Sequence, residues 1–445
     1  MDSRRAIVVL VVACLAYVVA ILQRTSVGVV GVEATTRFSI DATAVSSLAV
    51  LQLGVYAILQ IPVGVLIDRF GPRVLIAAGA IAMALGQAAV ALASDLGIAV
   101  VGRVLVGAGD AMTFLSVLRL LGAWFSPPRL PQLQQWVGTL GQSGQLLSAV
   151  PFVALLGLAG WTTAFLSAAS LSLLAAALVT AAVRDAPADH VDERALTLRI
   201  ALARLSDALR RPGTRLGFWA HAVTQSSPTM FVLLWGYPFL SVGLGYGPGL
   251  TGALLGLIVV AGAAAGPAIG LLSARFPLRR SSIVLGIVAA TAVAWAALLL
   301  PESPPPLPAV ILFLTVLAVG GPGSLIGFDF ARTFNPTASH GAATGFVNVG
   351  GFVTTVVLVL AVGLALDAVS SGTAPSELYA WQNWRLAFAV QYPLIGIAVA
   401  GLIVARRRTR RRLEEEEGIA VAPLWTAIIA RWRRGRRGIG GGGQG

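Results

Sequence analysis

The chain has 445 residues, of which 57% are hydrophobic and only 11% are charged, and its formal net charge is +13. A soluble protein of this length needs a charged surface, which about 25% charged residues normally supply. The composition therefore argues against a water-soluble enzyme and against a disordered chain, and it favours a polytopic membrane protein.

Twelve apolar segments are long enough to cross a bilayer as helices, for which about 20 residues are needed. They are residues 6–30, 43–67, 73–94, 97–121, 133–157, 161–183, 216–242, 250–274, 281–300, 308–331, 342–367 and 386–405. The first segment is too long for a cleaved signal peptide, and no small-residue cleavage site closes it. We therefore expect an all-α polytopic protein with twelve transmembrane helices.

Arginine supplies every basic residue of the chain, and its distribution predicts the orientation in the membrane. With the N-terminus inside, most arginines fall in inner loops and in the C-terminal tail, whereas the outer loops hold only Arg37 and Arg385. This asymmetry satisfies the positive-inside rule with both termini in the cytoplasm, so the cell (inner or plasma) membrane is the expected location. The same rule explains the positive charge without a nucleic-acid partner.

A charged segment at 184–215 divides the chain into two halves that carry related motifs. GVLIDRFGPR at 64–73 returns as GLLSARFPLRR at 270–280, and WTTAF at 161–165 returns as WRLAF at 384–388. Inverted or parallel repeats of this kind are typical of secondary transporters. We expect pseudo-symmetric six-helix bundles at 1–183 and 216–405, joined by a partly helical cytoplasmic linker at 184–215.

The C-terminal tail, residues 406–445, has two interpretations. Leu424, Trp425, Ile428, Ile429 and Trp432 follow a helical spacing among arginines, which predicts an interfacial helix on a leaflet of anionic lipids. The alternative is a disordered basic tail that only sets the topology.

The segment GVLIDRFGPR places an acid and two arginines where a helix meets the cytoplasm. It resembles the loop between the second and third helices of the major facilitator superfamily. The resemblance covers nearly the whole chain except the tail, and it implies two six-helix bundles that move by alternating access. It also implies that Asp68, Arg69 and Arg73, with the turn at Gly71, hold the bundles together on the cytoplasmic side. Ala274 replaces the acid in the second copy, so an asymmetric latch is expected.

The fourth span, GRVLVGAGDAMTFL, contains Arg103 and Asp110 on one helix face. Charge inside a membrane is costly, so both should face a partner or a wet cavity. The segment resembles the fourth helix of the anion:cation symporter branch of that superfamily, whose members couple organic anions to protons or sodium. The resemblance makes Asp110 the candidate proton-coupling acid, together with Arg103. The alternative is a structural Arg–Asp pair that joins helices.

Arg24 in the first span is the candidate for the anionic group of a substrate. The same branch carries an arginine near this point, and a guanidinium fork suits carboxylate or phosphate. Gln23, Tyr56 and Gln60 are further substrate-binding candidates. Many relatives carry an acid where Gln23 stands, so coupling would rely on Asp110 alone or be absent. The alternative for Arg24 is an interfacial side chain that snorkels outward.

The second half supplies His221 and Gln225, which lie one turn apart on the seventh span. The SSP run at 226–228 predicts a broken, polar-lined helix there. Asn348 and Gln391 are weaker substrate-site candidates, and for His221 we favour a hydrogen-bonded packing role.

Asp329 and Arg332 close the tenth span and are predicted to belong to an inner-gate network. We expect no metal or other cofactor, because the three histidines are scattered along the chain. ATP-driven transport by this chain alone is excluded, because a phosphate-binding loop of the GxxxxGK[ST] type needs a lysine that the sequence lacks.

The sequence therefore predicts a secondary active transporter, not an enzyme, that moves a small organic anion with protons. One alternative is a proton-driven exporter of drugs or metabolites with the same fold. A second is a non-transporting membrane sensor or scaffold that acts through its basic tail.

Overall fold

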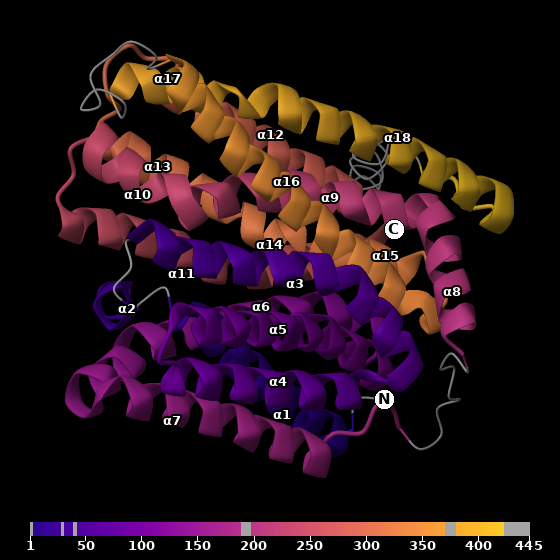
Figure 1. The fold of residues 1–445 in the computed structure, drawn as a ribbon. Helices are drawn as coiled ribbons and strands as arrows, with labels where there is room; N and C mark the ends of the chain where they lie inside the picture. Colours follow the sequence, from indigo (N-terminus) through magenta and orange to yellow (C-terminus); the bar gives the residue numbers. More distant parts are fainter. Residues whose placement is uncertain (1–2, 28–30, 39–41, 188–196, 370–379, 422–445) are drawn as a thin grey trace, which may run out of the picture.

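The computed structural model describes residues 3–27, 31–38, 42–187, 197–369 and 380–421. Helices and the turns between them make up these residues, and no strand occurs among them. Figure 1 shows the two halves of the chain as two groups of helices that lie against each other, the first indigo to magenta and the second pink to yellow. The predicted all-α architecture is confirmed.

In the first half, the described residues form seven α-helices. They are α1 (Arg4–Thr25), α2 (Gly31–Phe38), α3 (Ala42–Phe70), α4 (Pro72–Leu92), α5 (Leu96–Trp124), α6 (Leu130–Leu147) and α7 (Val153–Ala182). A π-helical turn at Ser148–Phe152 joins α6 to α7. Gly160, with φ of +79°, breaks α7 and separates the fifth crossing from the sixth.

The second half begins after the linker helix α8 (Leu198–Arg210). Its helices are α9 (Pro212–Met230), α10 (Gly236–Pro238), α11 (Pro248–Arg275), α12 (Arg280–Leu299), α13 (Leu307–Ala318), α14 (Gly320–Ser324), α15 (Ile326–Thr333), α16 (His340–Val369), α17 (Trp381–Ala389) and α18 (Gln391–Glu417). The tenth crossing is thus built from three successive segments, α13 to α15, and the twelfth from two, α17 and α18.

Local sequence explains where these helices start. Proline occupies the first position of α4, α9 and α11, where the missing N–H costs nothing and the fixed φ suits the helix. The side chain of Asp95 caps α5 by accepting from the Ile98 amide at 3.1 Å. Thr197 caps the linker helix α8 in the same way, at 3.3 Å from the Ile200 amide.

The twelve expected crossings can be followed in the described part of the chain. Ten helical segments there are long and apolar enough to span a membrane. One of them, Pro127–Ala182, has 56 residues and holds two crossings on either side of Gly160. These segments account for eleven crossings. The remaining one is the seventh in chain order, in which α9 continues through π-helical turns to Gly243.

Three sequence-based boundaries need correction. Helix α1 ends at Thr25, five residues before the predicted end of the first span. Helix α9 is not broken at the SSP run but passes through Pro228 and widens into a π-helical turn only at Phe231. Helix α18 continues past residue 405 to Glu417, where exposed pairs such as Arg411–Glu415 support it. The predicted interfacial helix around 424–432 lies outside the described residues.

Glycines bring the backbones of α4 and α5 into direct contact inside the first half. A Cβ at Gly109 would overlap the carbonyl oxygen of Gly79. We expect Gly109→Ala to destabilise the protein by about 1–3 kcal/mol, because the backbone has no room to move apart. Thermal unfolding of the detergent-purified protein measures this. Gly122→Ala, on the same helix and with no atom near its Cβ, should leave the melting temperature unchanged.

The two halves meet mainly through α3 against α16 and α6 against α11. Gly64 of α3 faces the backbone of Gly341 so closely that a Cβ on either residue would overlap the other. On the second pair, a Cβ at Gly270 would lie 2.9 Å from the Cα of Gln132. These approaches occur near the end of the molecule that carries the loop arginines and α8, here called the arginine-rich end (Figure 1). The sequence predicts that this end faces the cytoplasm.

Candidate substrate site and inner gate

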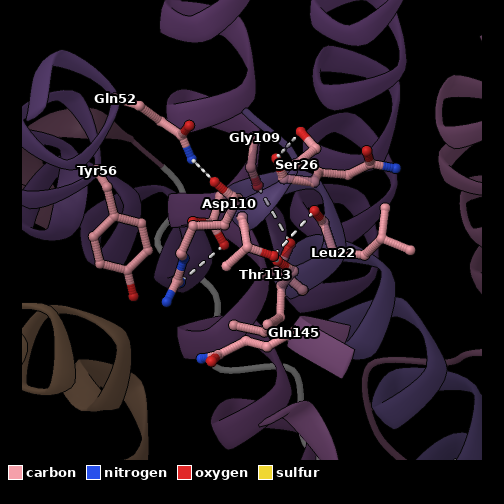
Figure 2. A network of polar contacts seen from close by, with 12 residues as sticks. Leu22, Ser26, Gln52, Tyr56, Gly109, Asp110, Thr113 and Gln145 are labelled. Carbon is pink, nitrogen blue, oxygen red and sulfur yellow. Dashed lines mark hydrogen bonds and ion pairs between the residues drawn. The ribbon is translucent and has the colours of Figure 1, made fainter. Parts of the chain in front are cut away.

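An ion pair between α1 and α5 lies within the first half. Arg24 holds the carboxylate of Asp110 with both prongs of its guanidinium, from Nε at 2.6 Å and from Nη2 at 3.0 Å. The Asp110 side chain is fully buried, whereas 22% of the Arg24 side chain is exposed. Figure 2 shows Asp110 with Gln52 and Tyr56 of the neighbouring helix α3. A two-pronged, charge-assisted contact of this kind fixes the orientation of both groups.

Arg103 lies deeper and makes no direct ion pair with Asp110 among the described residues. Its guanidinium donates to the Ser26 hydroxyl at 3.3 Å, to the Arg24 carbonyl at 3.1 Å and to the Gln52 amide oxygen. Seven residues along a helix span about 10.5 Å, which is too far for a direct contact. The acid of the fourth span therefore pairs with the arginine of the first span, and the second arginine caps the end of α1.

Gln23 faces the interior of the first half. Its amide donates to the Ala168 carbonyl at 2.7 Å and to the Ser172 hydroxyl at 2.8 Å, and it accepts from Gln87 at 2.7 Å. The structure thus places this substrate-binding candidate between α1, α4 and α7, where it supports the helix that carries Arg24.

Three other candidates meet across the interface between the halves. The Asn348 amide of α16 donates to Gln60 at 2.6 Å and to the Tyr56 hydroxyl at 3.3 Å, both on α3. The Tyr56 ring in turn lies under the guanidinium of Arg24, 4.7 Å from its carbon. A continuous set of contacts therefore leads from Asp110 through Arg24 and Tyr56 to the second half.

The remaining substrate-binding candidates lie on α9 and α18 of the second half. A ring nitrogen of His221 is 3.0 Å from the Ser324 carbonyl, and its ring packs 4.9 Å from Phe328. Gln225 is partly exposed one turn further along α9. Gln391 is buried and accepts from Ser227 at 3.0 Å, which places it inside the second half.

Asp68 closes the arginine-rich end. Its two carboxylate oxygens accept from the amides of Gly341 and Ala342, each at 2.9 Å. These amides belong to the first turn of α16, where unpaired N–H groups and the helix dipole favour an anion. The motif acid thus holds the second half through the backbone.

The motif arginines do not share this role in the structure. Arg73 donates its backbone amide to Asp185 at 2.6 Å and its side chain to the Thr180 carbonyl, so it joins α4 to the end of α7. Arg69 stacks on Phe70. Gly71 adopts φ of +84°, which only glycine takes without strain, and this lets α4 begin immediately after α3.

Asp329 organises the corresponding end of the second half. It accepts from Arg332 at 2.7 Å and from Ser273 at 2.7 Å, and Arg280 lies 3.8 Å away. Arg332 also lines a cavity of about 20 Å³ between the halves, together with Leu118, Arg119, Gly122, Gln134, Phe328, His340 and Thr344. The two residues thus lie near the arginine-rich end, and their ion pair stays within one half.

Sequence reasoning missed Gln52 and Arg280. Gln52 starts a series at four-residue spacing that continues through Tyr56, Gln60 and Gly64 to Asp68, and this series is the face of α3 that meets α5 and α16. Residues four positions apart share one face of a helix, so this spacing could have indicated Gln52 from the sequence. Arg280 ends the repeated motif, but nothing in the sequence indicated Asp329 as its neighbour.

A wider cavity of about 460 Å³ lies away from this site, at the opposite end of the second half. Its lining includes Leu299, Arg385 and Tyr392. Among the described residues, no group of three or more histidine, cysteine or acidic side chains is placed to hold a metal ion.

Two helical halves that meet through α3 against α16 and α6 against α11, with a buried ion pair inside the first half, have the architecture of a polytopic membrane transporter. The profile of the Major Facilitator Superfamily matches residues 13–358, and the chain belongs to this superfamily. Its members are transporters, not enzymes. The chain is accordingly a multi-pass membrane protein.

Two solved structures share the fold over nearly the whole chain. The human organic anion transporter MFSD10 (TETRAN) is 14% identical, with a TM-score of 0.63 over 91% of this chain and 100% of that one. A bacterial homologue of the human lysosomal transporter Spinster, in an inward-facing and unoccupied conformation, is 16% identical, with a TM-score of 0.59 over 92% and 98%. The comparison with curated proteins finds no match.

Proposed function

We propose that this protein is a secondary active transporter that moves a small organic anion by alternating access, coupled to protons at Asp110. The observation that carries the proposal is the charge of the buried site. Two guanidiniums and a single carboxylate lie there, and of the two only the Arg24 guanidinium contacts the carboxylate of Asp110, while Arg103 lies buried at the end of α1. Arginine stays protonated in proteins, so the site is positively charged whether or not Asp110 carries a proton, and this charge attracts an anion.

The Arg24–Asp110 pair gives a mechanism for coupling. While Asp110 is ionised, it occupies both prongs of Arg24. A proton on Asp110 removes its negative charge and frees the fork for the carboxylate of a substrate. Proton and anion together leave the net charge of the site unchanged, which avoids the cost of carrying a second charge through the bilayer.

The contacts of Tyr56 connect the state of Arg24 to the gate. Its ring lies against Arg24 and its hydroxyl accepts from Asn348 of the other half. A movement of Arg24 from Asp110 to a bound anion would therefore shift Tyr56 and loosen the Asn348 contact. His221 and Gln225 would complete the site from the second half once the bundles rock.

A carboxylate such as a sugar acid is the substrate class that suits this site best. The arginine fork matches the two oxygens of a carboxylate, and the polar side chains of Gln60 and Asn348 can bind hydroxyl groups. The resemblance to the anion:cation symporter branch supports the same class. The human organic anion transporter MFSD10, which shares this fold, is a precedent for an anionic substrate. Phosphate-bearing metabolites are a second class that the same fork accepts.

The test uses purified protein in liposomes with an inward proton gradient and a panel of labelled organic anions. We expect accumulation of at least one anion, and a loss of at least about tenfold in its uptake by Arg24→Ala, because a charged hydrogen-bonded contact is removed. Arg37→Ala, in an outer helix, serves as the control for loss of one arginine.

Each rival function makes a different prediction in this assay. Unchanged uptake by Arg24→Ala would remove this residue from the substrate site and favour an exporter of drugs or metabolites. An absence of flux for every compound, in both directions, would favour the sensor or scaffold.

A further inference from the structure

Three arginines converge where α12 begins and α18 leaves the apolar span. Arg279 immediately precedes α12, and Arg406 and Arg410 lie one turn apart on α18. Arg406 is repelled by both of the others, and Arg410 by Arg279. All three are partly buried, so the surrounding protein weakens the screening that water would provide.

The hydrogen-bonding capacity of this cluster is only partly used. Nη1 of Arg279 and Nε of Arg406 are buried without a hydrogen-bond partner, whereas Nη2 of Arg406 donates to the Ser282 hydroxyl at 3.1 Å. Within the described part of the chain, none of the three forms an ion pair with an acid. Buried donors are normally paired, and unpaired buried charge is costly.

The start of α4 in the first half is the place equivalent to the start of α12, and an acidic side chain lies there. There, the helix after the repeated motif, α4, begins at Pro72, and the backbone amide of Arg73 donates to the carboxylate of Asp185 at 2.6 Å. That acid follows α7, which carries the WTTAF motif just as α17 carries WRLAF. In the second half α12 corresponds to α4 and α18 to the end of α7. The chain supplies arginines there instead of an acid.

We propose that the arginine cluster at the start of α12 and on α18 binds a phosphate group, held by Arg279, Arg406 and Arg410 with help from Ser282. The bound anion would take the place that Asp185 occupies in the first half. Phosphate suits the cluster because several guanidinium donors can share its oxygens, and the first turn of α12 adds a favourable dipole. The group belongs either to the headgroup of an anionic phospholipid or to free phosphate.

The position of the arginine cluster favours contact with the membrane surface. Ala405 is the last residue of the apolar part of α18, and Arg406 follows it directly. The arginines are thus at the depth where lipid phosphates lie, on the face expected to meet the anionic cytoplasmic leaflet.

The experiment compares two double variants of the full chain with the same change in charge. Arg406→Gln/Arg410→Gln removes two members of the cluster, and Arg407→Gln/Arg408→Gln removes two exposed neighbours on the same helix. Delipidated protein in neutral detergent is titrated with phosphatidylglycerol and followed by native mass spectrometry. A second arm titrates inorganic phosphate, against chloride at equal ionic strength, and follows the thermal midpoint.

We expect the cluster variant to weaken binding at least about tenfold and the control variant by less than about twofold, because only the cluster makes directed contacts. Specific loss in the lipid arm alone identifies a headgroup, and loss in both arms identifies phosphate in general. Without ligand, the cluster variant should melt at or above the wild-type temperature, because repulsion is relieved. Equal loss in both variants, or no binding in either arm, overturns the proposal.

Discussion

Asp110→Asn is expected to abolish proton-driven accumulation while leaving exchange of substrate intact. Asparagine resembles the protonated acid in shape but cannot release a proton, so Arg24 stays free at every pH. For one proton per monovalent anion, a gradient of two pH units can drive about 100-fold accumulation. The variant should reach only about equal concentrations inside and outside. Liposomes with imposed pH gradients measure this ratio, and counterflow of labelled substrate measures exchange.

The pH dependence of binding gives an independent readout. In the wild-type protein, low pH should favour anion binding, because protonation of Asp110 releases Arg24, and rising pH should weaken it. The variant should bind with little dependence on pH. Glu302→Gln, an exposed outer-loop acid, is the matched control and should behave as the wild type. Gradient-driven accumulation retained by Asp110→Asn would remove this residue from the coupling mechanism.

Gly64→Val is expected to lower transport at least about 30-fold by preventing closure at the arginine-rich end. A Cβ at this position would overlap the backbone of Gly341 in the other half, and backbone cannot move aside as a side chain can. Overpacking costs about 1–3 kcal/mol, and here it affects only the conformation that is closed at the arginine-rich end. The equilibrium therefore shifts toward the open conformation by the same free energy. Initial rates of uptake, with protein amount held constant, measure the effect.

The same helix supplies the control for this substitution. Gly54 lies nearer the start of α3 and has no atom within 4 Å of its Cβ, so Gly54→Val should retain transport. The midpoint of thermal unfolding should be similar for both variants. The Gly64 contact lies between the halves, so the packing inside each half is unchanged. A Gly64→Val protein that transports at the wild-type rate would show that this contact does not form in the transport cycle.

Much of the fold follows from sequence because hydrophobic length and arginine placement act locally. Apolar runs of about 20 residues must become helices in a bilayer, where backbone groups have no water to pair with. The interruptions of the helix in the seventh and tenth crossings are harder to predict from the sequence. Pro228 predicts a break, yet the helix passes through it and widens only at Phe231. Proline is tolerated inside membrane helices because local π-helical adjustments and neighbouring groups can satisfy a freed carbonyl.

Which charges are unusual can be read from the amino-acid sequence alone: Arg24, Arg103 and Asp110 are charged residues inside spans of a chain that is poor in charge. The resemblance of its motif to the superfamily also indicated that Asp68 lies at a contact between the halves. The partners of these residues depend on the three-dimensional packing. Asp110 pairs with a residue 86 positions away, and Asp68 with amides 273 and 274 positions away. Spacing along one helix fixes which residues share its face, but the rotation of each helix against its neighbours depends on packing over the whole molecule.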